Sequence, residues 1–170
     1  MGKDLRTYLA DLEKTYPEAV LRIDKPMSVR YEITALQRKL DAQKKYPVII
    51  VDRPILDNGE ESQFSVVANL TASRELCAKI LKIDPRNVAK EYSDCMAKRK
   101  EPLQVSKEEA PVKEVIEKGE AVNILKFPIL THNYMDPGPY IGTGFVATYD
   151  PDTGIDNCCL QRIWAKGPRR

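Results

Sequence analysis

The most constraining feature of the sequence is a pair of β-type segments that flank one strong turn. Residues 141–149 and 155–164 read as strands, and Asp-Pro-Asp-Thr-Gly at 150–154 separates them. Because proline presets φ and glycine accepts a positive φ, this pentapeptide favours a reversal of the chain. The pattern predicts a long antiparallel hairpin. A hairpin alone lacks the further strands and the core that a stable β domain needs, so we expect the chain to be the front part of something larger.

The sequence before residue 100 has a different character, because helical and strand periodicities alternate there. Amphipathic helices are predicted at 4–14, 30–45, from Thr71 or Ser73 to 81, and from 85 to about 98, with Val88, Tyr92 and Met96 facing inward. Strands are predicted at 19–23, 47–51 and 63–68, and extended segments at 112–116 and 124–129. The alternation favours an α/β layered domain over residues 1–105, and the charged stretch 98–102 is typical of a linker. Residues 106–170 form a second, β-rich part.

Composition excludes several functional classes. Lysine and arginine number 27 against 25 aspartate and glutamate, a balance that argues against nucleic acid as a partner. No apolar run approaches the roughly 18 residues of a membrane span, and the charged start is not a secretory signal. The four cysteines form no CxxC pair, so we expect reduced thiols in a cytoplasmic protein and no zinc site. With one histidine, a complete histidine-based metal or catalytic site cannot come from this chain alone.

The richest motif runs FPILTHNYMDPGPYIGTG over 127–144, followed by DPDTGIDNCCLQR at 150–162 and KGP at 166–168. In order, spacing and turn sequence this resembles the UbiD family of decarboxylases, which read close to FPIPTHHxxDxGPYITxG, DPxTGxxNxxxxR and KGP. The upstream segments LRTYL, YEITAL and NLTASR are compatible with the front domain of such enzymes. The resemblance implies an α/β fold whose second part is a flavin-binding split β-barrel, of which this chain would hold only the first strands.

The resemblance also implies an activity and its cofactors. The activity is reversible non-oxidative decarboxylation of an aromatic or α,β-unsaturated carboxylic acid, with prenylated FMN, Mn²⁺ or Mg²⁺, and K⁺ as a further cation. A flavin prenyltransferase would supply the cofactor, and the complete enzyme would form a homo-oligomer. The cofactor would perform the difficult chemistry while the protein positions and polarises the substrate.

Residue roles follow only where positions match the family motif. Asn157 matches the asparagine that binds the metal beside the cofactor phosphate, although its position alone is typical of a strand entry after a turn. Arg162 matches the catalytic arginine, whose guanidinium suits a carboxylate through two parallel hydrogen bonds. Further cofactor contacts are implied for Thr143, whose alternative is a plain β-former, and for the main chain of Cys159, Leu160 and Gln161.

Strict alternation places Asn157 and Arg162 on opposite faces of a flat strand, since they are five residues apart. A shared site needs a bulge, a strong twist or a kink, and we predict one between Cys158 and Gln161. His132 occupies one histidine of the family pair, and Asn133 replaces the other. We expect His132 to be structural or part of a loop near the site rather than a metal ligand.

The resemblance leaves part of the site outside these residues. The family's metal-binding histidine and glutamate, and its acid–base carboxylates, match no position here, so we expect weak cofactor binding and no turnover from the chain alone. Two other functions remain open. One is a module that holds ordinary flavin, and the other is a non-catalytic subunit whose exposed hairpin edge pairs with another chain.

Overall fold

The computed structural model describes residues 4–98 and 103–170, and the predicted linker beyond Lys98 lies outside them. The chain divides into two compact units. The first comprises Met1–Leu21, Tyr46–Ile49 and Val67–Ala121, and the second comprises Arg22–Lys45, Ile50–Val66 and Val122–Arg170. Each unit therefore gathers segments that are far apart in the sequence. The predicted domain boundary near residue 105 stays a prediction.

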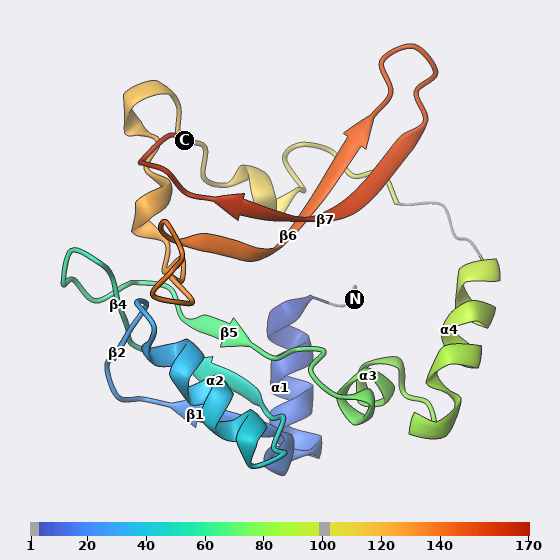
Figure 1. Ribbon diagram of the computed structural model, residues 1–170. Coiled ribbons are helices and arrows are strands. Elements are labelled where there is room, and N and C mark those ends of the chain that lie inside the picture. The colour runs from blue at the N-terminus through green and yellow to red at the C-terminus, as the bar shows by residue number, and fades with distance from the viewer. Residues whose placement is uncertain (1–3, 99–102) are drawn as a thin grey trace. The chain divides into compact units, whose positions relative to one another are not determined.

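The helices of the first unit are α1 (Leu5–Thr15), α3 (Arg74–Leu81) and α4 (Val88–Ala97) (Figure 1). At the start of α1, the Asp4 side chain accepts a hydrogen bond from the Thr7 amide at 2.7 Å, while Thr7 Oγ1 accepts one from the Asp4 amide at 3.2 Å. This reciprocal capping satisfies two backbone donors that have no partner within the helix. Ser73 is the cap of α3, because its Oγ accepts a hydrogen bond from the Leu76 amide at 3.1 Å.

The apolar stripe of α4 is not buried. Tyr92 is 56% exposed and Met96 is 62% exposed, so the predicted inward orientation is wrong for these side chains. Helical periodicity shows which side chains share a face, but it does not show that another surface covers that face.

A three-stranded sheet has the order β1 (Val20–Ile23), β3 (Val48–Val51) and β5 (Val66–Ala68). All four residues of the central strand β3 are buried, at most 2% exposed. An apolar β-branched run is typical of such a strand, because both of its faces are covered. The predicted α/β class is confirmed, with small sheets and no closed barrel among the described residues.

In the second unit, helix α2 (Glu32–Ala42) buries Ile33. The short strands β2 (Met27–Ser28) and β4 (Pro54–Ile55) pair in parallel.

Two segments predicted as extended contain single 3₁₀ turns instead, Pro111–Lys113 and Ile124–Lys126. Proline occupies the first position of the one turn, and Asn123 caps the other by accepting a hydrogen bond from the Leu125 amide at 3.0 Å. These local turn signals outweigh the β-propensity of the valines and isoleucines around them.

The predicted hairpin is present in the second unit as β6 (Tyr140–Tyr149) and β7 (Asp156–Trp164), two antiparallel strands drawn in orange and red in Figure 1. In its turn, Asp150 Oδ1 accepts hydrogen bonds from the amides of Asp152 at 2.9 Å and Thr153 at 2.8 Å. Gly154 adopts a φ of 71°, which only glycine accepts easily. The turn therefore forms where the sequence predicts it, with glycine at the position that needs a positive φ.

All four cysteines are free thiols. No helix among residues 4–98 and 103–170 is long and apolar enough to cross a membrane.

Candidate functional site on the β6–β7 hairpin

The hairpin contains a bulge, and it lies on the strand opposite to the one that we predicted. Ile141 pairs with Ile163 and Gly144 pairs with Gln161, so two residues of β6 face the single residue Arg162 of β7. The pairs from Gly144 to Tyr149 continue without a shift, so the predicted bulge between Cys158 and Gln161 is wrong. The extra residue on β6 increases the local twist of the ribbon, and the glycines at 142 and 144 accommodate it.

This bulge brings two predicted site residues together. The two residues opposite Arg162 are Gly142 and Thr143, so the threonine lies across the ladder from the arginine. Both side chains are exposed. A bulge often redirects a side chain beside a functional site. Here the bulge lies opposite Arg162, the cationic residue of β7 to which the family motif assigns a role.

Arg162 lies over an aromatic ring. Its guanidinium carbon is 5.4 Å from the centre of the Tyr140 ring, and Tyr140 stacks on Trp164 with 6.0 Å between ring centres. No ion pair to Arg162 occurs within residues 4–98 and 103–170, so the ring orients the guanidinium while its N–H donors face no carboxylate there. This arrangement leaves the Arg162 guanidinium available to bind an anionic ligand.

The residues between the two key positions alternate along β7. Gln161 Nε2 lies 3.2 Å from Cys159 Sγ, so these two side chains share a face, whereas Leu160 points to the other face and is 73% exposed. Their main-chain groups form the regular ladder with Gly144, Phe145 and Val146.

Asn157 is the predicted site residue that the hairpin does not bring close to Arg162. It pairs with Thr148 near the turn and lies five positions before Arg162 along the strand, a distance of about 17 Å. Its side chain is exposed. Within the described residues no group of three or more His, Cys, Asp or Glu side chains is arranged to hold a metal. The amide oxygen of Asn157 suits a metal ion that is bound to a phosphate, and the guanidinium of Arg162 suits an anionic ligand. The two residues therefore fit part of a site for a metal ion and a phosphate-bearing cofactor.

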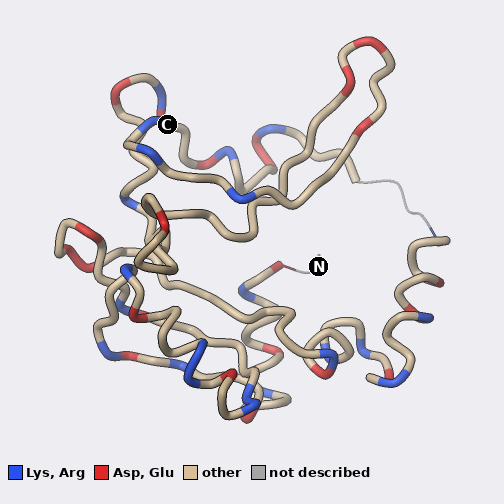
Figure 2. Tube along the Cα trace, viewed as in Figure 1, with Lys and Arg blue, Asp and Glu red and all other residues tan. Residues whose placement is uncertain are grey.

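Charge is distributed unevenly along the hairpin (Figure 2). The turn end carries the carboxylates of Asp150, Asp152 and Asp156, and the opposite end carries Arg162 and Lys166. Lys166 Nζ lies 4.3 Å from the centre of the Trp164 ring. A cation is therefore favoured near Asn157, and an anion near Arg162.

His132 lies in the segment before β6, close to the bulge. Its Nδ1 is 3.3 Å from Thr34 Oγ1 of α2, and its ring is half-buried. The neighbouring Asn133 accepts a hydrogen bond from Arg38 at 2.9 Å. The expectation of a residue in a loop near the site is consistent with this position.

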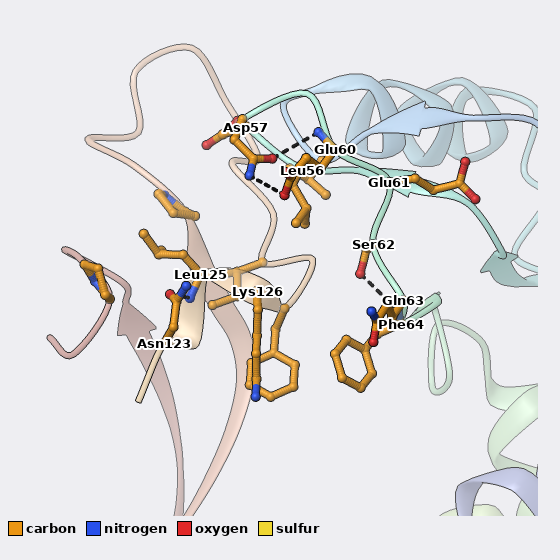
Figure 3. Close-up of a pocket in the computed structure, with 16 residues that line it drawn as sticks. Leu56, Asp57, Glu60, Glu61, Ser62, Gln63, Phe64, Asn123, Leu125 and Lys126 are labelled. Carbon is orange, nitrogen blue, oxygen red and sulfur yellow. Dashed lines mark hydrogen bonds between the residues drawn. The ribbon is translucent and has the colours of Figure 1, made fainter. Parts of the chain in front are cut away.

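A separate cavity of about 530 Å³ also lies within the second unit (Figure 3). Phe64 and Phe127 contribute rings 4.9 Å apart, and no predicted site residue lines the cavity. Figure 3 shows Asp57 and Glu60 on one side and Leu125 and Lys126 on the other.

The carboxylates around this cavity are already bound. Asp57 pairs with Arg30 at 3.2 Å and Glu61 with Arg53 at 2.7 Å. The hydrogen bond from Arg53 lowers the pKa of Glu61, which keeps that carboxyl ionised and unsuited to act as a general acid. The cavity can hold an apolar group, but its lining offers no evident acid–base pair.

Sequence reasoning missed the aromatic support under Arg162. Tyr140 belongs to the quoted motif, but no pattern in one sequence shows that its ring lies below a residue 22 positions later. An approximate signal exists, because a hairpin centred on residues 150–154 places 140 opposite 164, with 162 close by.

Comparisons with known families agree with the sequence motif. A model described as the 3-octaprenyl-4-hydroxybenzoate carboxy-lyase N-terminal domain, UbiD_N, matches residues 10–96. A second, described as the Rift-related domain of the same carboxy-lyase, UbiD, matches residues 103–170. Together the two matches cover both the α/β part and the hairpin.

Individual relatives are also similar over nearly the whole chain. Anhydromevalonate phosphate decarboxylase of Methanothermobacter thermautotrophicus is 28% identical over 94% of this chain and 34% of its own length. The enzyme of the same name from Methanocaldococcus jannaschii is 31% identical over 91% of this chain and 32% of its own length. An evolved dimeric form of the UbiD-class enzyme HmfF from Pelotomaculum thermopropionicum, solved in complex with prFMN, aligns with a TM-score of 0.84 and 29% identity. That alignment covers 98% of this chain and 37% of HmfF, so the chain spans about a third of these relatives.

Proposed function

Because this chain belongs to the 3-octaprenyl-4-hydroxybenzoate carboxy-lyase (UbiD) family, we propose that it is the front part of a decarboxylase that uses prenylated FMN. The reaction is the reversible non-oxidative decarboxylation of an aromatic or α,β-unsaturated carboxylic acid. The proposal rests on one combined observation. Both family models match this chain, and a solved enzyme that is similar to it was determined in complex with prFMN. The named decarboxylases among the relatives support the same class of reaction.

Arg162 is the proposed catalytic residue. A guanidinium donates two parallel hydrogen bonds to a carboxylate, which orients the substrate and stabilises its negative charge before CO₂ leaves. Its unpaired state within the described residues and its support by Tyr140 favour this role. Prenylated FMN, when bound, supplies an electrophilic centre that accepts the electron pair left by the departing carboxylate.

Asn157 is the proposed metal ligand near the cofactor phosphate. Its amide oxygen is a hard donor, as Mn²⁺ or Mg²⁺ prefers, and the acidic turn beside it favours a cation. K⁺ is a further cation that we include in the proposal. The separation of about 17 Å between Asn157 and Arg162 suits an elongated ligand with a phosphate at one end and a reactive ring at the other.

The remaining proposed contacts lie between these two ends. Thr143 offers a hydroxyl from the bulge, and Cys159, Leu160 and Gln161 offer main-chain donors and acceptors to the flavin. The bulge increases the local twist of the hairpin, while β7 keeps its regular alternation between Asn157 and Arg162.

This chain supplies about half of the proposed site. A histidine, a glutamate and the acid–base carboxylates must come from outside these residues, either from the same polypeptide or from a partner subunit. We therefore expect the isolated chain to be inactive and to bind cofactor weakly. The complete enzyme is proposed to be a cytoplasmic homo-oligomer that receives its cofactor from a flavin prenyltransferase.

A second candidate is a flavin-binding module or a non-catalytic subunit that pairs with another chain. The observation in its favour is the apolar exposure of the hairpin, where Phe145 is 70% exposed and its partner Leu160 is 73% exposed. Such a cross-strand pair is suited to being covered by further protein.

The test replaces Arg162 in the complete enzyme, which is the longest polypeptide that contains this chain together with any subunit that co-purifies. We expect Arg162→Ala to abolish turnover with little loss of bound cofactor, and Arg162→Lys to restore only part of the rate. Arg86→Ala is the matched control, because Arg86 is an exposed arginine of the first unit that pairs only locally, with Asp84 at 2.6 Å. A rate for Arg162→Ala equal to that of the wild type would contradict the assigned role.

A further inference from the structure

The only histidine of the chain lies between helix α2 and the bulge of β6. On one side, its Nδ1 is 3.3 Å from Thr34 Oγ1. On the other side, its Nε2 would lie 3.7 Å from a Cβ atom added at Gly142, which is one of the two bulge residues. Apart from Gly142 and its two chain neighbours, no other heavy atom of the described residues would lie within 4 Å of that position. The imidazole is therefore the side chain toward which the bulge points at residue 142.

The backbone before this histidine is held from two directions. The Thr131 amide donates to the Val29 carbonyl at 3.1 Å, and the Thr131 carbonyl accepts from the Tyr31 amide at 2.9 Å. The Tyr140 amide donates to the Leu130 carbonyl at 2.8 Å. Because these bonds fix the backbone between α2 and the start of β6, they leave the imidazole little freedom to move away from the bulge.

The start of α2 is itself constrained. Tyr31, which precedes the helix, has a φ of 68°, a conformation that is unfavourable for a residue with a side chain. Such a conformation persists only where the surroundings determine it. Here the Tyr31 amide is bound to Thr131, and the first residue of the helix, Glu32, accepts a hydrogen bond from the Ser28 amide at 2.7 Å. The strained start places Thr34 where it meets the imidazole.

We propose that His132 is a positioning residue that holds the β6 bulge, and through it Thr143 and Arg162, in place for the reaction. This inference rests on the proposed function, because it assigns His132 a part in that same site. A bulge lacks one rung of the ladder, so its position depends on support from outside the hairpin. A Cβ atom at Gly142 would lie 3.7 Å from Nε2, an ordinary van der Waals separation, so the imidazole lies beside the bulge. Misplacing a reacting group by about 1 Å can cost on the order of a hundredfold in rate.

The contact itself is tested by NMR on the complete polypeptide that contains this chain. The imidazole signals of His132 are assigned by their loss in His132→Ala. Gly142→Leu places a bulky side chain against Nε2, so we expect the imidazole Hε1 signal to shift. Ala147→Leu is the matched control, since Ala147 is an exposed residue of the same strand opposite Cys158, and we expect no shift there. Identical imidazole signals in Gly142→Leu and the wild type would overturn the inference.

The positioning role is tested in the complete, cofactor-loaded enzyme. We expect His132→Ala to lower kcat on the order of tenfold to a hundredfold, with a change in KM of less than threefold. His132→Asn, whose amide can occupy the place of Nδ1 beside Thr34 Oγ1, should restore more of the rate than His132→Leu, which fills the space without a polar atom. A kcat for His132→Ala within twofold of the wild type would overturn the inference.

Further variants keep the test decisive if His132→Ala fails to fold. Thr34→Val keeps the shape of its side chain and removes the hydroxyl beside Nδ1, so kcat should fall severalfold. Wild-type kcat in both Thr34→Val and Gly142→Leu would then overturn the positioning role. A wild-type enzyme without bound flavin and without turnover would instead contradict the proposed function. The positioning role would fall with it, whereas the NMR comparison would still decide whether the imidazole contacts the bulge.

Discussion

Replacement of Gly144 by alanine tests the geometry of the hairpin most sharply. A Cβ atom at this position would lie 2.6 Å from Cδ1 of Ile163 and 2.8 Å from the carbonyl oxygen of Gln161. Favourable contacts between carbon atoms occur at about 3.5–4.0 Å, so both neighbours would have to move. The Ile163 methyl can rotate, but the Gln161 carbonyl belongs to the ladder and cannot move without disturbing its pairing with Gly144.

The expected magnitude follows from two opposing terms. Overpacking of this kind costs about 1–3 kcal/mol. Gly144 does not have a positive φ, so alanine also gains about 0.4–1 kcal/mol by restricting the unfolded chain. The net loss in the free energy of unfolding is therefore about 0–2.6 kcal/mol. At Gly142, where the one contact would be 3.7 Å, only the gain applies, and Gly142→Ala should be neutral or slightly stabilising.

The assay is urea unfolding of the two variants, followed by tryptophan fluorescence. Trp164 is the only tryptophan, and it lies on β7 with its ring stacked on Tyr140, so its emission reports on the hairpin. The denaturant slopes must agree between variants for the midpoints to be compared as stabilities. Equal midpoints for Gly144→Ala and Gly142→Ala would refute the reasoning, because the two changes differ only in the space that the hairpin leaves for them.

Two further predictions concern single polar groups in the second unit. Thr131 is 2% exposed and its Oγ1 has no hydrogen-bond partner among the described residues, so Thr131→Val should leave the midpoint of thermal unfolding unchanged or raise it, by up to about 1 kcal/mol in stability. A clear loss of stability would show that the hydroxyl has a partner. At the turn, hydrogen bonds from the Thr153 and Asp152 amides lower the pKa of Asp150, so this carboxylate stabilises the turn above its ordinary pKa of 3.8, and the contribution is lost as pH falls through the lowered value. Amide exchange of Gly154 during an acid titration measures this effect, and Asp150→Ala should abolish that pH dependence.

The sequence predicted the elements whose signals are local. The amphipathic helix predicted at 4–14, the strand predicted at 47–51 and the turn at 150–154 each depend on a few neighbouring residues, and the structure confirms all three. The 3₁₀ turns at 111–113 and 124–126 were not predicted, because proline and asparagine signals compete there with β-branched residues over a short range.

The candidate site was less accessible to sequence reasoning. Alternation led us to predict an irregularity between Cys158 and Gln161, whereas the extra residue of the hairpin lies on β6, between Ile141 and Gly144. The two glycines of β6 were the usable signal, since glycine in a strand often marks a bulge. The contact between Thr34 and His132 joins residues 98 positions apart, and one sequence contains no information about such a pair.

The central claim, that the hairpin belongs to a prenylated-FMN site, is tested most directly by the identity of the bound cofactor. The complete enzyme is produced with and without a flavin prenyltransferase, and the released small molecule is identified by mass spectrometry and absorbance. The account predicts a prenylated flavin in the first preparation, and much less of it when Asn157 is replaced by alanine. Ordinary FMN at the same level in both preparations, or no flavin in either, would contradict the claim.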